Sequence, residues 1–195
     1  MEIDSGRIYP NCPVIIRMVE VGGLTKSELL QKLKEYSVRM NESGDRLFAD
    51  DRFTTSIEKC ILQTVELTVD NLGFSEGGTL SEIFARATKL GLELCPLELG
   101  PHLRLAYLDQ PEGSSGKPSR LHQAPFGSIT IASETLSEDD DFPKGFYLRR
   151  IEGVLWLRGY HATNLYVWKP DDHLIFCQSM NPMKKVESER KPGHT

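Results

Sequence analysis

The stretch GFYLRRIEGVLWLRGYH, residues 145–161, decides the fold, because its side chains alternate in character on both sides of a short turn signal. We predict a hairpin with strands over 145–151 and 154–160, joined by the two-residue turn Glu152-Gly153. The register set by this turn pairs six residues on one largely apolar face, namely Phe146 with Gly159, Leu148 with Leu157, and Arg150 with Leu155. We therefore expect this face to lie against the core.

The other face of the hairpin carries arginine and aromatic side chains. Tyr147 lies opposite Arg158 and Arg149 lies opposite Trp156, so two guanidinium groups lie against two aromatic rings. These four residues are referred to below as the ladder. Planar guanidinium groups beside aromatic rings suit the recognition of carboxylates, phosphates or nucleobases, although Arg beside Trp also occurs as ordinary surface packing. The ladder is the predicted binding surface.

Two further residues are predicted to extend the ladder. The run LRLAYLD at 103–109 alternates as a strand does, and such a strand beside the hairpin would turn Arg104 toward the ladder. His161 follows the second strand of the hairpin directly. The predicted ligand-binding residues are Tyr147, Arg149, Trp156, Arg158, Arg104 and His161.

Helix signals stand in the first half of the chain. Thr25 and Thr79 each precede a Glu by three residues, which is the spacing of a capping box at the start of a helix. Asn41 is the predicted N-cap of a shorter helix, and Gly91 suits the end of the helix that starts at Thr79. Strand-like runs cover 14–21, 63–69, 103–109, 128–133, 145–151, 154–160 and 173–178.

This order of elements predicts an α+β fold. Helices precede a β-rich half with hairpin connections, so we expect N-terminal helices packed on one side of a mainly antiparallel C-terminal β-sheet. The length predicts a single domain over residues 1–178. The Pro-, Gly- and Ser-rich segment 111–125 is a predicted mobile loop, and the polar residues 179–195 are a predicted disordered tail.

Composition narrows the classes of function. The chain of 195 residues has a formal net charge of -5, so no overall basic field draws in nucleic acid, and duplex nucleic acid is not an expected partner. The four cysteines are far apart and read as reduced thiols. Acidic residues stand near Met1, and no apolar run approaches the roughly 20 residues of a membrane span. We therefore expect a cytoplasmic location and no membrane association.

Several motif-like strings do not hold up as sites. The string GSSGKPS at 113–119 resembles a phosphate-binding loop, but Pro111 and Pro118 occupy positions that such a loop reserves for Gly and for Ser or Thr. The acidic run 138–141 lacks the alternation and the Gly of a calcium loop. Residues 171–173, Asp-Asp-His, read as a turn into a strand rather than as metal ligands. The sequence predicts no metal site and no cofactor.

Three longer strings carry a resemblance to a known family: GLELCPLELGP at 91–101, FPKGFYLR at 142–149 and WLRGY at 156–160. Together they resemble an uncharacterised family of small bacterial proteins, over roughly residues 24 to 177. Members are sometimes labelled helicases by automated naming, but this chain has no Walker loop, no Asp-Glu-x-x box and too little length for two motor domains. The resemblance implies no established activity and assigns no functional residue.

These observations predict a non-catalytic, cytoplasmic binding protein for a small anionic, nucleotide-like ligand or for a protein partner. The alternative is an enzyme acting on a nucleotide or phosphorylated metabolite, with Arg149 and Arg158 holding the anion and His161 or Asp109 as acid-base group. A third interpretation is a purely interaction-driven module. The sequence does not predict an oligomeric state.

Overall fold

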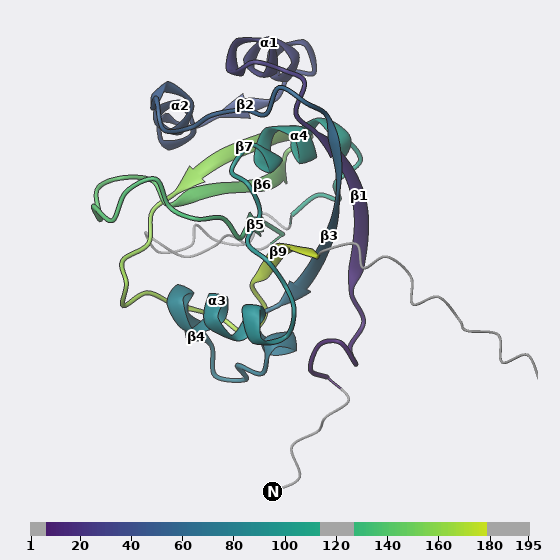
Figure 1. Ribbon diagram of the computed structural model, residues 1–195, viewed down its shortest axis with the longest axis vertical. Helices are drawn as coiled ribbons and strands as arrows, with labels where there is room; N and C mark the ends of the chain where they lie inside the picture. The colour runs from purple at the N-terminus through teal and green to yellow at the C-terminus, as the bar shows by residue number, and fades with distance from the viewer. Residues whose placement is uncertain (1–6, 114–126, 179–195) are drawn as a thin grey trace, which may run out of the picture.

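The computed structural model describes residues 7–113 and 127–178 and places a seven-stranded sheet at the centre of the fold (Figure 1). The strands lie in the order β1-β3-β9-β5-β6-β7-β2. Their bounds are β1 Ile15–Val21, β2 Arg39–Met40, β3 Cys60–Thr68, β5 Ile129–Ile131, β6 Gly145–Ile151, β7 Val154–Tyr160 and β9 His173–Gln178. Neighbouring strands are antiparallel except for the pairs β5–β9 and β2–β7. The fold is α+β with a mainly antiparallel sheet, to which the first half of the chain also contributes strands.

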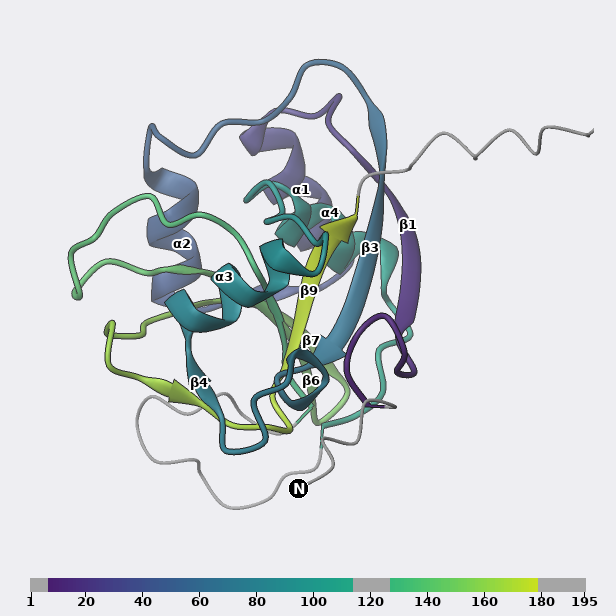
Figure 2. The same cartoon turned by 60° about the horizontal axis from the view of Figure 1, so that its bottom comes forward.

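Helices cover both faces of this sheet (Figures 1 and 2). One face carries α1 Lys26–Glu35, α2 Glu42–Ala49 and α4 Leu99–Ala106, and the other carries α3 Leu80–Lys89, the short η1 Asp70–Leu72 and the small sheet of β4 Gly78–Thr79 with β8 Val167–Trp168. The prediction of helices on a single side is therefore wrong. Its physical reason lies in β3, where the four consecutive residues 64–67 are all buried, so both faces of the strand need a cover.

Two hydrophobic cores follow from this layering. The larger core, beneath α1, α2 and α4, contains Val19, Leu29, Leu47, Phe53, Phe146 and Leu157 among others. The α3 core, on the opposite face, contains Val65, Leu72, Ile83, Trp168 and Phe176 among others. Each face of the sheet thus contributes side chains to its own core. Along the central strands, successive side chains therefore point alternately into one core and into the other.

The predicted helix starts are confirmed. Thr25 and Thr79 form complete capping boxes with the Glu three residues on, and Asn41 caps α2 by accepting a hydrogen bond from Gly44 N at 3.0 Å. Gly91 follows the end of α3 with a φ of 80°, a left-handed conformation that glycine adopts without steric cost.

The predicted hairpin is also confirmed, in bounds and in register. Tyr147 pairs with Arg158 and Arg149 pairs with Trp156, while Phe146 and Leu148 face the larger core. The turn residues Glu152 and Gly153 have φ values of 50° and 76°, as a tight hairpin turn with two left-handed residues requires.

The predicted strand over 103–109 is wrong, because residues 99–106 form helix α4. Leu99 and Leu103 are four residues apart and both fully buried, which is the spacing of a helix rather than of a strand. Pro101 stands in the first turn, where a missing N–H costs no intrahelical hydrogen bond. Arg104 consequently belongs to a helix of the larger core.

Three sequence predictions fall largely or wholly outside the described residues: the loop 111–125, the phosphate-loop-like string 113–119 and the tail 179–195. Within residues 7–113 and 127–178, no helix is both long and apolar enough to cross a membrane.

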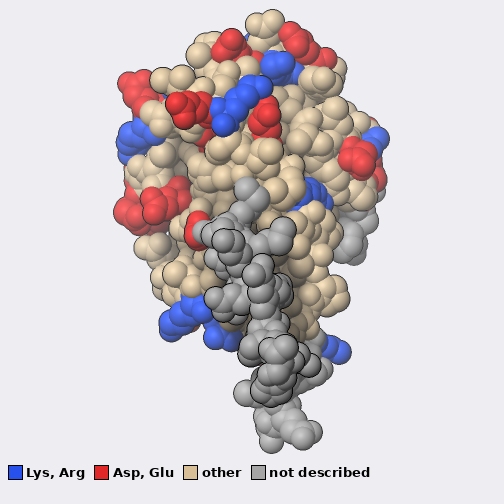
Figure 3. Space-filling model, turned by 45° about the vertical axis from the view of Figure 1, so that its right-hand side comes forward, with Lys and Arg blue, Asp and Glu red and all other residues tan. Residues whose placement is uncertain are grey.

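The edge strand β1 exposes several apolar side chains. Ile15, Ile16 and Met18 on β1, and Ile61 on β3, are each about half exposed. The side of the molecule that carries β1 shows a broad uncharged area between clusters of charged groups (Figure 3).

Candidate functional site

The ladder lies on the face of the sheet that α3 covers, since Tyr147 packs against the α3 core. The guanidinium carbon of Arg158 lies 5.1 Å from the centre of the Trp156 ring and 6.0 Å from the centre of the Tyr147 ring. All four ladder residues are partly buried. The structure therefore brings together the four residues of the hairpin that the sequence singled out.

A third arginine, which the sequence did not predict, joins them from β2. Arg39 pairs with Trp156 in the parallel pair of strands β2 and β7, and its guanidinium carbon lies 6.0 Å from the centre of the Trp156 ring. Trp156 thus interacts with cations from two different strands. Only the pairing of residues 117 positions apart in the chain creates this contact, and no local pattern around Arg39 signals it.

The ladder arginines have no counter-charge among the residues that the structure describes. The Nε atoms of Arg149 and Arg158 are buried and have no hydrogen-bond partner, and no ion pair to Arg39, Arg149 or Arg158 exists among the described residues. Burial lowers the pKa of Arg149, and the charge of Arg158 lowers it further, while Tyr147 acts in the opposite direction. Two repelling, partly desolvated cations on adjacent strands form a site that an anion would stabilise.

Arg104 does not join the ladder. It is fully buried within α4, on the opposite face of the sheet, where its guanidinium group donates to Gln110 Oε1 and to the Tyr107 carbonyl. Burial lowers the pKa of Arg104 to about 10, and the charge of Arg150 adds to this effect. Arg104 orders the chain that follows α4 and has no access to a ligand on the ladder.

His161 also lies apart from the ladder. Its Nε2 atom is 2.9 Å from Ser43 Oγ, in the first turn of α2, and α2 packs on the face opposite to α3. The side chains of β7 that face the α3 core stop at Tyr160. The sequence placed His161 near the ladder because it follows β7 directly, but a change of one residue along a strand reverses the face.

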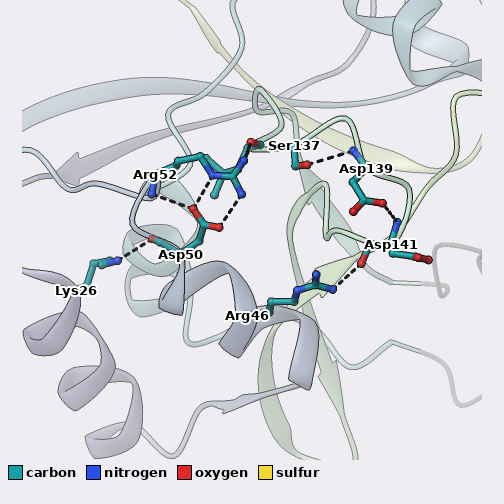
Figure 4. A network of polar contacts seen from close by, with 8 residues as sticks. Lys26, Arg46, Asp50, Arg52, Ser137, Asp139 and Asp141 are labelled. Atoms are coloured by element: carbon teal, nitrogen blue, oxygen red, sulfur yellow. Dashed lines mark hydrogen bonds and ion pairs between the residues drawn. The ribbon is translucent and has the colours of Figure 1, made fainter.

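The acidic run 138–141 is an exposed loop attached to α2 through its backbone, as Figure 4 shows. Arg46 donates to the Asp141 carbonyl at 2.6 Å, and Lys144 donates to the Asp139 carbonyl at 2.9 Å. The Asp139 carboxylate accepts a hydrogen bond from Asp141 N at 3.0 Å. No group of three or more His, Cys, Asp or Glu suited to a metal ion exists in the described parts of the chain.

A second cluster of charged groups, which sequence reasoning missed, lies where β1, β3 and β9 meet. Glu66 is 5% exposed, and its carboxylate lies 2.6 Å from Arg17 Nη1 and 2.9 Å from His173 Nδ1. Burial raises the pKa of Glu66, but the hydrogen bonds from His173 and Arg17 outweigh burial and hold it below its ordinary value. The hydrogen bond to Glu66 raises the pKa of His173, against the effect of burial.

Residues 171–173 form the predicted turn into a strand. The Asp172 carboxylate accepts a hydrogen bond from Lys169 N at 2.8 Å, and β9 begins at His173. Burial raises the pKa of Asp172 to about 6, and Asp171 next to it adds to this rise. The turn therefore holds a carboxyl group that titrates close to neutral pH.

This raised pKa predicts a pH-dependent effect of Asp172→Asn on stability. The unfolded carboxyl group loses its proton near its ordinary pKa of 3.8, the folded one near 6, so folding favours the protonated form. The resulting stabilisation is complete below about pH 4 and is lost as the pH rises through 6. We expect Asp172→Asn, whose side chain still accepts from Lys169 N, to be about 1 kcal/mol more stable than wild type at pH 8 and equal to it at pH 4, after allowance for solvent screening.

Thermal melts at the two pH values check this expectation, with the exposed Asp140→Asn as the control for loss of one carboxylate. Equal differences from wild type at both pH values would show that Asp172 titrates normally in the folded protein.

No family model, no curated protein and no solved structure matches this chain.

Proposed function

We propose that this protein is a non-catalytic binding protein that holds a small anionic, nucleotide-like ligand on the ladder. The observation that carries the proposal is the pair Arg149 and Arg158, two neighbouring cations with buried, unpartnered Nε atoms and no ion pair among the described residues. A buried donor without a partner costs about 1–3 kcal/mol, so a ligand oxygen that accepts from it recovers that energy.

The rest of the ladder suits the same ligand class. Phosphate and carboxylate groups accept hydrogen bonds from a planar guanidinium fork, and Arg39 adds a third cation at the exposed edge of the sheet. Tyr147 and Trp156 supply aromatic surface beside the arginines, which favours a ligand that combines an anionic group with a flat ring.

Binding is favoured over catalysis at this surface. A catalyst needs an acid-base group within hydrogen-bond reach of the bound substrate. The imidazole that the sequence predicted here, His161, lies with α2 on the opposite face of the sheet and contacts Ser43. The four free thiols support a reducing, cytoplasmic environment for this binding protein.

The test begins with native mass spectrometry of gently purified protein and continues with calorimetric titration of adenosine diphosphate and of inorganic pyrophosphate. We expect Arg149→Ala and Arg158→Ala each to weaken binding about 10- to 100-fold, the value of a lost charge-assisted hydrogen bond. Their stability should stay within about 0.5 kcal/mol of wild type, because neither guanidinium group forms an ion pair among the described residues and the ring contacts of Arg158 are partly exposed. Lysine at either position should not restore full affinity, since it lacks the planar fork.

Arg150→Ala is the matched control. Arg150 follows Arg149 directly on β6, so its side chain points to the other face of the sheet. Its Nε atom lies 3.5 Å from the Glu112 carboxylate. Its loss should leave the affinity unchanged. The proposal is contradicted if all three alanine variants weaken binding equally. It is also contradicted if wild type binds neither probe at millimolar concentration. In that case, retention of a protein from lysate that depends on Arg149 favours a protein partner.

A further inference from the structure

A cavity of about 420 Å³ opens on the face of the sheet opposite to the ladder, beyond the end of α4. Its floor consists of side chains from four strands: Ile15, Glu66, Ile129 and His173. Its walls are the chain after α4, including Tyr107 and Gln110, and the turn 169–172 before β9. This volume is that of a site for a small molecule.

Glu66 is the buried carboxylate in this floor, and it already has two hydrogen-bond partners. One oxygen of Glu66 binds Arg17 Nη1 at 2.6 Å, and the other lies 2.9 Å from His173 Nδ1. Arg17 in turn lies over the Tyr107 ring, 4.3 Å from its centre, so the group that neutralises Glu66 is itself fixed by packing. Glu66 is thereby held as an anion in a position set by three strands.

This arrangement leaves one ring nitrogen of His173 without a partner among the described residues. Because Nδ1 faces Glu66, the other ring nitrogen, Nε2, points away from it, and no described residue forms a hydrogen bond with Nε2. The His173 side chain is 43% exposed and lines the cavity. A neutral imidazole that donates from Nδ1 to a carboxylate presents a basic lone pair at Nε2.

Stability alone gives little reason for the pair. An ion pair with one member this exposed adds little to stability, whereas burial of Glu66 carries a desolvation cost. A carboxylate that orients an imidazole toward an open cavity is, by contrast, a common arrangement of acid-base sites.

The charges around His173 define the ligand. Asp171 and Asp172 flank it on the turn, Glu112 stands on the opposite wall 3.5 Å from Arg150, and Lys169 is a cation of the same turn. The carboxylates that line the cavity outnumber its lysine and arginine side chains, which disfavours anions. Ile15, Ile129 and Tyr107 provide apolar surface. A small neutral molecule with an apolar body and an acidic hydroxyl group fits these features.

We propose that this cavity is a second site, in which His173 is the acid-base group for a small neutral hydroxyl compound and Glu66 is its positioning residue. The ligand O–H bond breaks as the N–H bond forms at His173 Nε2. The electron pair stays on the ligand oxygen, and Glu66 stabilises the imidazolium through Nδ1. This site is independent of the ladder, so either proposal can fail without the other.

The probe is para-nitrophenol, a neutral phenol whose anion is coloured, titrated with full-length protein one pH unit below the pKa of the free dye. We expect a saturable rise in the absorbance of the phenolate, because the bound pair is a phenolate against a protonated His173. Where His173 carries its proton before binding, the proton of the dye goes to the solvent instead. His173→Gln should still bind the dye in equilibrium dialysis but lower the bound phenolate fraction about tenfold. Glu66→Gln should lower it several-fold, because the imidazole loses the anion that raises its basicity.

His161→Gln, on the α2 side of the molecule, is the matched control and should leave the signal unchanged. The imidazole carbon signals of His173 in an NMR titration give a second readout that needs no dye: its pKa should lie above that of a free histidine in wild type and fall in Glu66→Gln. The proposal is wrong if wild type shows no saturable phenolate signal, or if the signal survives His173→Gln.

Discussion

Phe146→Ala is expected to lower the free energy of unfolding by about 3–5 kcal/mol, the cost of deleting a large buried aromatic side chain. Phe146 is fully buried in the larger core, with its ring centre 5.6 Å from that of Phe48 and 6.0 Å from that of Phe53. It also fills the space above Gly100 in α4. The variant should leave a cavity bordered by α2, by α4 and by the segment that carries Phe53. Because these parts are held by other contacts, they cannot easily move together to close it.

Urea unfolding and thermal melts measure this loss, which corresponds to roughly 2–4 °C per kcal/mol for a chain of this size. Ile57→Ala, at a side chain that is 95% exposed, is the control and should stay within about 0.5 kcal/mol of wild type. A Phe146→Ala variant as stable as the control would show that β6 presents its other face to this core.

Asn41→Ala is expected to cost about 2–4 kcal/mol, because one side chain makes three partly buried hydrogen bonds. Its Oδ1 caps α2 by accepting from Gly44 N at 3.0 Å and also accepts from Gly159 N at 2.8 Å, while its Nδ2 donates to the Gly159 carbonyl at 3.0 Å. The side chain thus continues the pairing of β2 with β7 after the backbone has turned into a helix. Alanine removes the cap and leaves both polar groups of Gly159 without their partner.

Asn41→Asp separates these contributions. The aspartate keeps the cap and the acceptor for Gly159 N but cannot donate to the Gly159 carbonyl, so we expect a loss between those of wild type and Asn41→Ala in the same melts. If Asp and Ala cost the same, the amide of Asn41 is not oriented toward Gly159 as the structure has it.

The hairpin could be predicted from the sequence because all of its information is local. Alternation with a period of two sets the two faces, and the turn Glu152-Gly153 sets the register, so each cross-strand pair follows from counting. The ladder is a consequence of that register and was found for the same reason. Arg39 was missed because its approach to Trp156 depends on the parallel pairing of a two-residue strand.

Helix α4 was misread because its polar and apolar residues alternate by chance over Leu103, Arg104 and Leu105. Such alternation is taken as a strand signal on the assumption that charged side chains face solvent. Arg104 is fully buried instead, with Gln110 and the Tyr107 carbonyl accepting from its two Nη atoms. The signals that favour the helix are the spacing of Leu99 from Leu103 and the proline in the first turn.

The Glu66 cluster could not be predicted at all. Glu66 and His173 are 107 residues apart and meet only because β3 pairs with β9. In the sequence Glu66 reads as the solvent-facing residue of an alternating strand, since nothing local shows that both faces of β3 are covered. Long-range pairing also decided that α3 lies on the opposite face from the other helices.

The position of β9 has a consequence for how the chain acquires its structure during synthesis. β9 joins two parts of the sheet that are not otherwise hydrogen-bonded to each other as strands, the β1–β3 pair on one side and the β5–β6–β7–β2 group on the other. It is also the last strand of the described chain, so the ribosome must deliver residues 173–178 before the sheet can close. Until then each part exposes an unpaired inner edge, which is a template for association with other chains. Folding that waits for such distant pairing is slow, in the range of milliseconds to seconds, and a nascent chain stalled before β9 would depend on chaperones to stay unaggregated.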